Sequence, residues 1–308
     1  MDARPGRRGV IALSGSDPTI YPLIFGLGYS GRRIVERLRA NGGAEIAATV
    51  RDVGAATSQP GVRSLPFDGG HPSDAVTETL RTATHIVVTV PPGETGDPVL
   101  RHHAREIAEA PALRWIGYLS TIGVYGNHDG AWIDETAECR PRSPRTRARM
   151  ATEQAWQALA EEAGAGLAVF RIAGIYGPDR NALANLAAGT AHRIVKPGQV
   201  FNRIHVDDLA AVVVSALRLG ATGVFNVSDD EPAPPQDVVA YAARLIGLDP
   251  PPEIPFETAD LTPMARSFYG DNKRVRSTRL KRELGVALAF PTYREGLAAL
   301  AADAEGRD

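Results

Sequence analysis

Three glycines with the spacing G-x-G-x-x-G lie between a short apolar run and a helical pattern near the start of the chain. They are Gly26, Gly28 and Gly31, preceded by the apolar run 23–25 and followed by the helical pattern 30–40. Glycine at these places permits a tight turn, a close approach of backbone to a diphosphate, and close packing of helix on strand. The diphosphate would lie at the helix N-terminus. Because 31 glycines in 308 residues also produce such spacings in ordinary turns, the strand-to-helix context carries the prediction of a dinucleotide site.

The residue after the second apolar strand, Arg51, indicates which dinucleotide the site accepts. An acidic side chain there would bond a ribose 2′-hydroxyl, whereas an arginine can pair with a 2′-phosphate through charge-assisted hydrogen bonds. We therefore expect NADP as the cofactor, with NAD as the other possibility. The alternative is a solvated arginine whose charge Asp52 neutralises. Tyr29 and Ser30, in the variable places of the glycine turn, belong to the same predicted cofactor site.

Apolar strand candidates alternate with helical patterns along the first two thirds of the chain. Strands are predicted at 23–25, 45–50, 62–67, 85–90, 114–120 and 167–172. Helices are predicted at 30–40, 74–82, 98–109, 145–163 and 206–218. Such alternation is typical of an α/β fold in which helices cover both faces of a doubly wound parallel sheet.

Composition excludes several classes of protein. A net charge of -2 and a pI near 6.4 provide no basic field for nucleic acid. No apolar run approaches the ~20 residues that span a bilayer, so no membrane association is expected. The single cysteine, Cys139, cannot form an internal disulfide, which favours a cytoplasmic protein. No metal site is predicted.

Six segments follow one another in a characteristic order from residue 22 onward. They are 25–31, 118–126, 171–178, 203–210, 225–228 and 272–275. This series resembles the extended short-chain dehydrogenase/reductases, also grouped as NAD-dependent epimerase/dehydratases. The resemblance implies a Rossmann domain over 21–180 that holds a nicotinamide cofactor. It also implies a smaller C-terminal substrate lobe over 181–308, interleaved with the last part of the sheet. Residues 1–20, where prolines and glycines interrupt a short apolar patch, are predicted to be an irregular extension.

The resemblance assigns further residues to the cofactor. Asp68, at the end of the third strand, falls near the adenine, and Val90 with Pro91 falls beside the adenosine ribose at the end of the fourth. Pro91 supplies no backbone N–H donor, which suggests a rigid wall there. Glu94 and Asp97, in the loop that follows, are expected to be solvated.

The catalytic positions of the family are only partly kept. Thr121 stands where the family has a catalytic serine or threonine, although a hydroxyl at a strand end can also simply bond backbone. Arg145 and Arg149 replace the usual tyrosine and the lysine four residues later. The spacing places both arginines on one helix face, directed toward the cofactor. Arginine stays charged, so it can bind an oxyanion but cannot exchange a proton near neutral pH.

Another proton donor would then be needed. Tyr125, Tyr176 and His205 are candidates from family-matching segments, and each also fits a packing role. For the substrate, four cations are candidates to hold an anionic group: Arg180, Lys196, Arg203 and Arg266. In nucleotide-sugar enzymes of the family an arginine stands where this chain has Phe201, which argues against a nucleotide sugar.

Two hypotheses follow for function, with a weaker third. The first is an NADP-preferring oxidoreductase or epimerase-like enzyme that acts on a small polar substrate without the usual tyrosine and lysine. The second is a catalytically silent NADP(H)-binding sensor or partner-binding protein. The third is a non-redox lyase or isomerase on the same fold. A homodimer is usual among relatives and is possible here.

Overall fold

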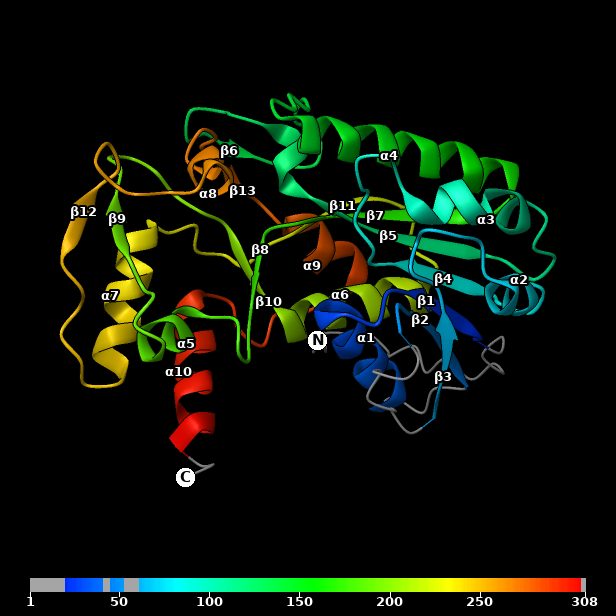
Figure 1. The fold of residues 1–308 in the computed structure, drawn as a ribbon, viewed down its shortest axis with the longest axis horizontal. Helices are drawn as coiled ribbons and strands as arrows, with labels where there is room; N and C mark the ends of the chain where they lie inside the picture. The colour runs from blue at the N-terminus through cyan, green and yellow to red at the C-terminus, as the bar shows by residue number, and fades with distance from the viewer. Residues whose placement is uncertain (1–19, 41–44, 53–60, 306–308) are drawn as a thin grey trace, which may run out of the picture.

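A parallel sheet of seven strands forms the centre of the larger lobe (Figure 1). The computed structural model describes residues 20–40, 45–52 and 61–305. The strands follow the order β11-β7-β5-β4-β1-β2-β3 across the sheet, and the neighbouring strands are parallel. They are β1 (Pro22–Phe25), β2 (Ile46–Val50), β3 (Val62–Pro66), β4 (His85–Val88), β5 (Trp115–Thr121), β7 (Gly166–Ile172) and β11 (Gly223–Val227). The strand order reverses between β1 and β4, which is where open α/β sheets bind ligands.

Helices cover both faces of this sheet, and Figure 1 shows α4 above the strands with α1 and α6 below them. The lower layer consists of α1 (Tyr29–Ala40), α6 (Val206–Leu219) and α9 (Thr278–Leu284). The upper layer consists of α2 (Asp74–Leu80), α3 (Pro98–Ala108) and α4 (Pro144–Glu162). A sheet covered in this way needs strands that are apolar on both sides, which is why their sequences are continuous apolar runs.

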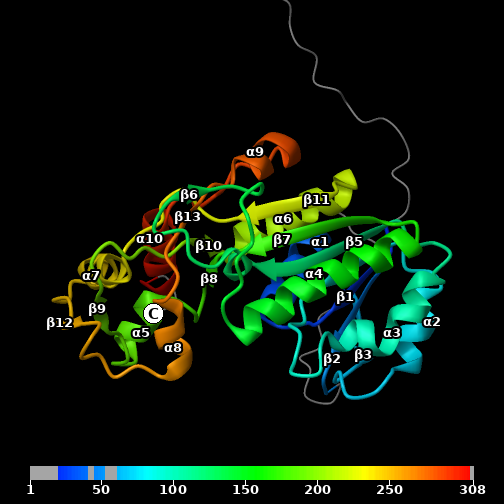
Figure 2. The ribbon, with the colours of Figure 1, turned by 90° about the horizontal axis from the view of Figure 1, so that it is seen from above.

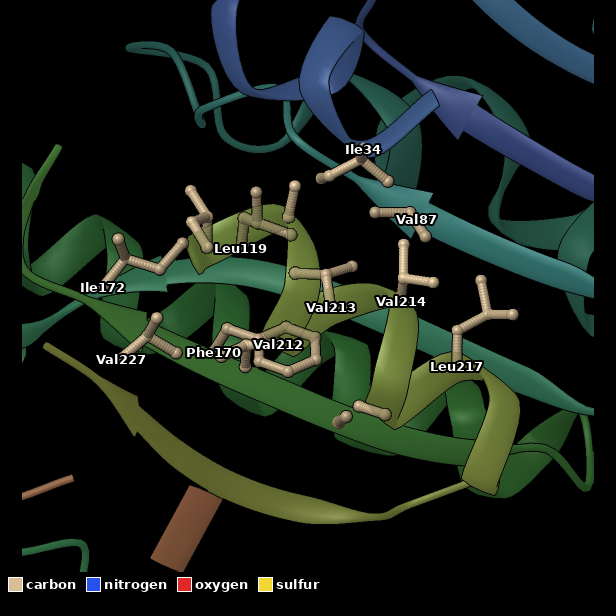
Figure 3. Close-up of a cluster of buried hydrophobic side chains, with 14 of the residues drawn as sticks. Ile34, Val87, Leu119, Phe170, Ile172, Val212, Val213, Val214, Leu217 and Val227 are labelled. Carbon is tan, nitrogen blue, oxygen red and sulfur yellow. The ribbon is translucent and has the colours of Figure 1, made fainter. Parts of the chain in front are cut away.

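The core between the sheet and the lower layer is drawn in Figure 3. Val87 of β4, Leu119 of β5 and Phe170 of β7 belong to one buried cluster with Val213 and Leu217 of α6. Each fully buried side chain of this kind stabilises the fold by about 1.5–3 kcal/mol. The cluster holds the carboxyl end of β5, and with it the candidate catalytic segment, against a rigid layer.

A second group of elements lies beside the carboxyl ends of β5, β7 and β11 (Figure 2). Its helices are α5 (Ala182–Ala187), α7 (Pro235–Leu245), α8 (Pro263–Phe268) and α10 (Tyr293–Glu305). Its strands form three parallel pairs: β8 (Gly174–Tyr176) with β10 (Arg203–His205), β9 (Arg193–Val195) with β12 (Glu253–Pro255), and β6 (Trp132–Ile133) with β13 (Arg274–Val275). Three later elements, α6, β11 and α9, return to the large sheet and its lower layer. The exact domain boundaries remain a prediction.

The predicted fold class is confirmed, and all eleven predicted elements exist. Two strands are shorter than expected: β3 ends at Pro66 and β4 ends at Val88. The seventh strand, β11, was not predicted as a strand. Of the irregular extension predicted for 1–20, residues 1–19 lie outside the described part of the chain. None of the helices in the described ranges has both the length and the apolar character needed to cross a bilayer.

Candidate functional site

The glycine turn between β1 and α1 has the geometry that its spacing predicts. Gly26 has φ +99°, and a Cβ built on it would lie 2.6 Å from Thr89 Oγ1. A Cβ on Gly31 would lie 2.1 Å from the carbonyl oxygen of Gly26. At Gly28, which is exposed, an added Cβ would meet nothing within 4 Å. The turn is therefore closed by Gly26 and Gly31 and left open at Gly28, at the start of α1.

Two threonines that the sequence analysis did not single out support this turn. Thr49 Oγ1 accepts a hydrogen bond from the N–H of Gly26 (2.8 Å), and the Thr89 hydroxyl donates to the carbonyl oxygen of Gly26 (2.8 Å). Thr49 lies in β2 and Thr89 directly follows β4, the two strands that flank β1. The sequence did offer a signal for this support, because a threonine hydroxyl stands near the end of each of these two strands. Its meaning depends on strand order, which the sequence does not state.

Tyr29 and Ser30 lie in the first turn of α1, and Tyr29 connects the turn to the smaller lobe. Its hydroxyl donates to the carbonyl oxygen of Pro178 (3.0 Å), and the guanidinium carbon of Arg180 lies 5.6 Å from its ring centroid. Burial raises the pKa of this phenol. The loop after β8 is thus held directly against the glycine turn.

The other predicted cofactor residues lie at the ends of the strands around this turn. Arg51 is exposed immediately after β2. Asp68 is exposed after β3 and accepts a hydrogen bond from the N–H of Gly70 (2.7 Å), which lowers the pKa of its carboxyl. The Cγ2 of Val90 lies 2.9 Å from the place of an added Cβ on Gly26, so Val90 borders the turn. Pro91 follows it and is exposed.

Asp97 is buried, so the expectation that it is solvated was wrong. Its Oδ1 accepts hydrogen bonds from the N–H groups of Val99 (2.8 Å) and Leu100 (3.2 Å) at the start of α3. Its Oδ2 accepts one from Trp156 Nε1 of α4 (3.1 Å). Three donors stabilise the buried carboxyl, whose pKa burial nevertheless raises.

Thr121 is the last residue of β5 and begins the short 3₁₀ helix η1 (Ile122–Tyr125). Its hydroxyl oxygen accepts a hydrogen bond from the N–H of Gly123 (3.1 Å). A Cβ on Gly123 would lie 3.1 Å from Thr146 Cγ2 and 3.3 Å from Thr121 Oγ1. Thr121 therefore lies next to the first turn of α4, which begins where Ser143 and Thr146 form a capping box.

The two arginines of α4 contact different partners. Arg145 is exposed, and its guanidinium carbon lies 5.0 Å from the ring centroid of Phe268 in α8. Arg149 donates from Nη1 to the Tyr118 hydroxyl (3.0 Å) and to the carbonyl oxygen of Leu119 (2.9 Å) in β5. The i, i+4 spacing thus places one arginine against the smaller lobe and the other against the end of the sheet.

The three alternative proton donors are all buried and held by the fold. The Tyr125 hydroxyl donates to Asn226 Oδ1 (2.7 Å), and burial raises its pKa to about 12. Burial raises the pKa of Tyr176 further. His205 is 2% exposed, and its Nδ1 accepts from the N–H of Asp207 (3.2 Å), while burial lowers its pKa. These surroundings support packing roles for all three.

A buried ion pair behind β5 was missed by the sequence analysis. Arg171 of β7 donates from Nη2 to Glu153 Oε2 of α4 (2.8 Å), and both side chains are less than one tenth exposed. Ser120 donates to Glu153 Oε1 (2.5 Å), and the Arg171 guanidinium carbon lies 4.8 Å from the Tyr125 ring centroid. This network joins the residue before Thr121 to α4, β7 and η1.

Three of the four cations predicted to bind an anion are occupied by backbone carbonyls. Lys196 donates to Tyr269, Arg266 donates to Ala259 (2.6 Å), and Arg203 donates to Phe201 (2.9 Å) and Ala233 (3.2 Å). Their donors hold loops of the smaller lobe. No group of three or more potential metal-binding side chains occurs in residues 20–40, 45–52 and 61–305.

Comparisons with known proteins agree with this geometry. Residues 103–228 match the model of the NAD dependent epimerase/dehydratase family. A Streptomyces protein named 3-diazoavenalumate denitrifying reductase is 31% identical over 146 residues, which is 43% of this chain and 46% of that protein. The chain thus matches about half the length of that relative.

Two solved structures extend the likeness over nearly the whole chain. A functionally unknown conserved protein from Silicibacter pomeroyi is 48% identical, with a TM-score of 0.83 over 93% of this chain and 100% of that one. A putative NAD-dependent epimerase/dehydratase from Methylobacillus flagellatus is 25% identical, with a TM-score of 0.72 over 93% of this chain and 99% of that one. With its parallel sheet and glycine turn, the chain belongs to the NAD dependent epimerase/dehydratase family.

Proposed function

We propose that the protein is an NADP(H)-dependent oxidoreductase or epimerase-like enzyme that acts on a small polar substrate. The glycine turn is the observation that carries this proposal. Gly28 leaves open the start of α1, and a helix start offers unpaired N–H groups and a favourable dipole to a diphosphate. Thr49 and Thr89 hold the turn in place before any ligand binds, so the turn loses little conformational entropy on binding.

NADP is favoured over NAD by the side chain that follows β2. Arg51 is exposed, and no carboxyl group stands in its place to accept a bond from a ribose 2′-hydroxyl. Its guanidinium would pair with a 2′-phosphate.

Thr121 and Arg149 are the residues proposed to act on the reacting groups. A bound nicotinamide would supply or accept the hydride. The Thr121 hydroxyl would donate a hydrogen bond to the substrate oxygen, because its lone pair already accepts the Gly123 N–H. Arg149 uses only Nη1 in the bonds described above, and its remaining N–H groups would bind a ribose hydroxyl or a developing oxyanion.

The silent NADP(H)-binding protein remains the second candidate, because the described site has no obvious proton donor. Arginines stand at the places of the family's tyrosine and lysine, and Tyr125 and Tyr176 are buried with raised pKa values. A silent protein would bind NADPH with no turnover of any small carbonyl compound. Calorimetry followed by an NADPH-oxidation screen separates the two candidates.

The first experiment is calorimetric titration with NADP, NADPH, NAD and NADH. We expect tight binding of the two phosphorylated forms only. Arg51→Gln should weaken NADPH binding by roughly 10-fold or more, as expected when a charge-assisted pair is lost, and should leave NADH unchanged. Arg244→Gln, an exposed arginine of α7, is the matched control. Equal affinities for NADH and NADPH would overturn the NADP assignment, and binding of none would overturn the proposed function.

A further inference from the structure

Arg145 presents a charge that nothing in the described part of the chain neutralises. Its contact is the ring of Phe268, and no ion pair or hydrogen bond of its guanidinium is found among the described residues. Nearby arginines differ: Arg140 pairs with Glu138 (2.9 Å), and Arg147 donates to the carbonyl oxygen of Arg142 (2.7 Å). A guanidinium lying over a ring keeps its N–H donors directed outward from its edge.

The surroundings of Arg145 combine this charge with apolar surface. Phe268 and Met264 are one turn apart on α8, and they are 46% and 65% exposed. On the other side, Thr146, the next residue of α4, lies against the segment that begins at Thr121. Arg145 therefore stands between the candidate catalytic hydroxyl and an exposed apolar helix face.

In the described part of the smaller lobe, an aromatic cluster occupies the place where nucleotide-sugar enzymes of the family have an arginine. Phe201, which replaces the family's arginine, packs edge-on against Tyr269 with centroids 5.1 Å apart. Tyr269 in turn stacks on Phe256 at 4.9 Å. Lys196 and Arg266 lie over the Phe256 ring and use donors on backbone carbonyls. The aromatic rings therefore occupy the place of Phe201, where the resemblance to nucleotide-sugar enzymes would require an arginine.

We propose that the substrate is a small organic anion with an apolar body. Its carboxylate or phosphate pairs with Arg145, and its body lies against Phe268 and Met264, which leaves the reacting carbon near Thr121. This inference rests on the proposed function and specifies its substrate class. In the family, the residue at this place is a tyrosine that moves a proton, and its replacement by arginine converts a proton donor into an anion-binding group.

The test uses the full-length protein loaded with NADPH, after NADPH binding has been measured by itself. Calorimetry then compares cinnamate with cinnamamide, which has nearly the same shape without the charge, and with phenyl phosphate, inorganic phosphate and UDP-glucose. We expect cinnamate or phenyl phosphate to bind at least 10-fold more tightly than cinnamamide and UDP-glucose. The stronger of the two shows whether carboxylate or phosphate is preferred.

Variants assign the binding to Arg145. Arg145→Gln should weaken binding of the preferred anion by roughly 10-fold, and Arg147→Gln, a nearby exposed arginine of the same helix, should not. Both variants should unfold at the wild-type temperature and keep NADPH affinity, so a loss of anion binding cannot come from unfolding. Three results would overturn the inference. Cinnamate and cinnamamide could bind equally well, neither anion could bind to the NADPH-loaded protein, or the two variants could weaken anion binding equally. Failure of NADPH to bind would instead overturn the proposed function.

Discussion

The guanidinium of Arg149 donates a 2.9 Å hydrogen bond to the carbonyl oxygen of Leu119, two residues before the end of β5. The same nitrogen donates to the Tyr118 hydroxyl, so α4 is fastened to the strand that ends at Thr121. In relatives with the usual sequence a lysine occupies this place. Here a longer side chain connects the helix to the sheet, and its Nε and Nη2 make no hydrogen bond to any residue that the structure describes.

Arg149→Ala should therefore affect both stability and cofactor binding. Loss of the two bonds leaves a buried tyrosine hydroxyl and a carbonyl without this partner, which should cost about 1–3 kcal/mol. NADPH affinity should fall several-fold if the remaining N–H groups contact the ribose. Urea unfolding and calorimetry measure the two effects, with Arg147→Ala as the control. An unchanged affinity for NADPH would remove Arg149 from the cofactor site.

Gly28→Ala and Gly31→Ala should separate ligand binding from folding. A methyl group on Gly31 would collide with the Gly26 carbonyl oxygen, so this variant should lose both stability and NADPH binding. A methyl group on Gly28 meets no protein atom within 4 Å, so Gly28→Ala should unfold near the wild-type temperature yet bind NADPH more weakly. Thermal unfolding with and without NADPH measures both. Wild-type affinity in Gly28→Ala would show that the diphosphate does not approach the turn there.

Breaking the buried pair of Glu153 and Arg171 should be strongly destabilising. Arg171→Met leaves a carboxylate that is 6% exposed without its cation, which should cost about 3–5 kcal/mol. The exposed pair of Arg140 and Glu138 is the comparison, and Arg140→Met should cost less than about 1 kcal/mol. Urea unfolding measures both values. Similar losses in the two variants would mean that the buried pair adds nothing beyond a surface contact.

Asp229 should make stability fall as the pH rises. Burial raises its pKa to about 8, whereas an unfolded aspartate titrates near ~3.9. Between these values the folded state keeps a proton that the unfolded state has lost, so the stabilising contribution is complete below about pH 4 and is lost as the pH rises through about 8. Asp229→Asn should flatten the unfolding temperature over this window. Asp230→Asn, at an exposed neighbour, should not, and equal slopes in wild type and Asp229→Asn would contradict the prediction.

Local patterns were sufficient to predict most of the sheet. The apolar runs that became β1, β2, β5 and β7 are continuous because both sheet faces are covered, and the helices between them have a clear apolar stripe. β11 (Gly223–Val227) was missed because Asn226 interrupts its short apolar run, and its partner β7 lies more than fifty residues away in the sequence. The short strands of the smaller lobe have three residues or fewer, which is too few for a period to be seen.

The sequence by itself determined the α/β class, the glycine turn and the replacement of tyrosine and lysine by arginines, because each depends on residue type and short spacing. Only the tertiary structure decided how these arginines are used. Arg149 bonds β5 and Arg145 contacts α8, although the two lie on one helix only a turn apart. The same holds for Asp97 and for Thr49 and Thr89, whose partners come from distant segments. A side chain's role depends on donors, acceptors and solvent that packing brings to it, and packing joins segments that local sequence cannot relate.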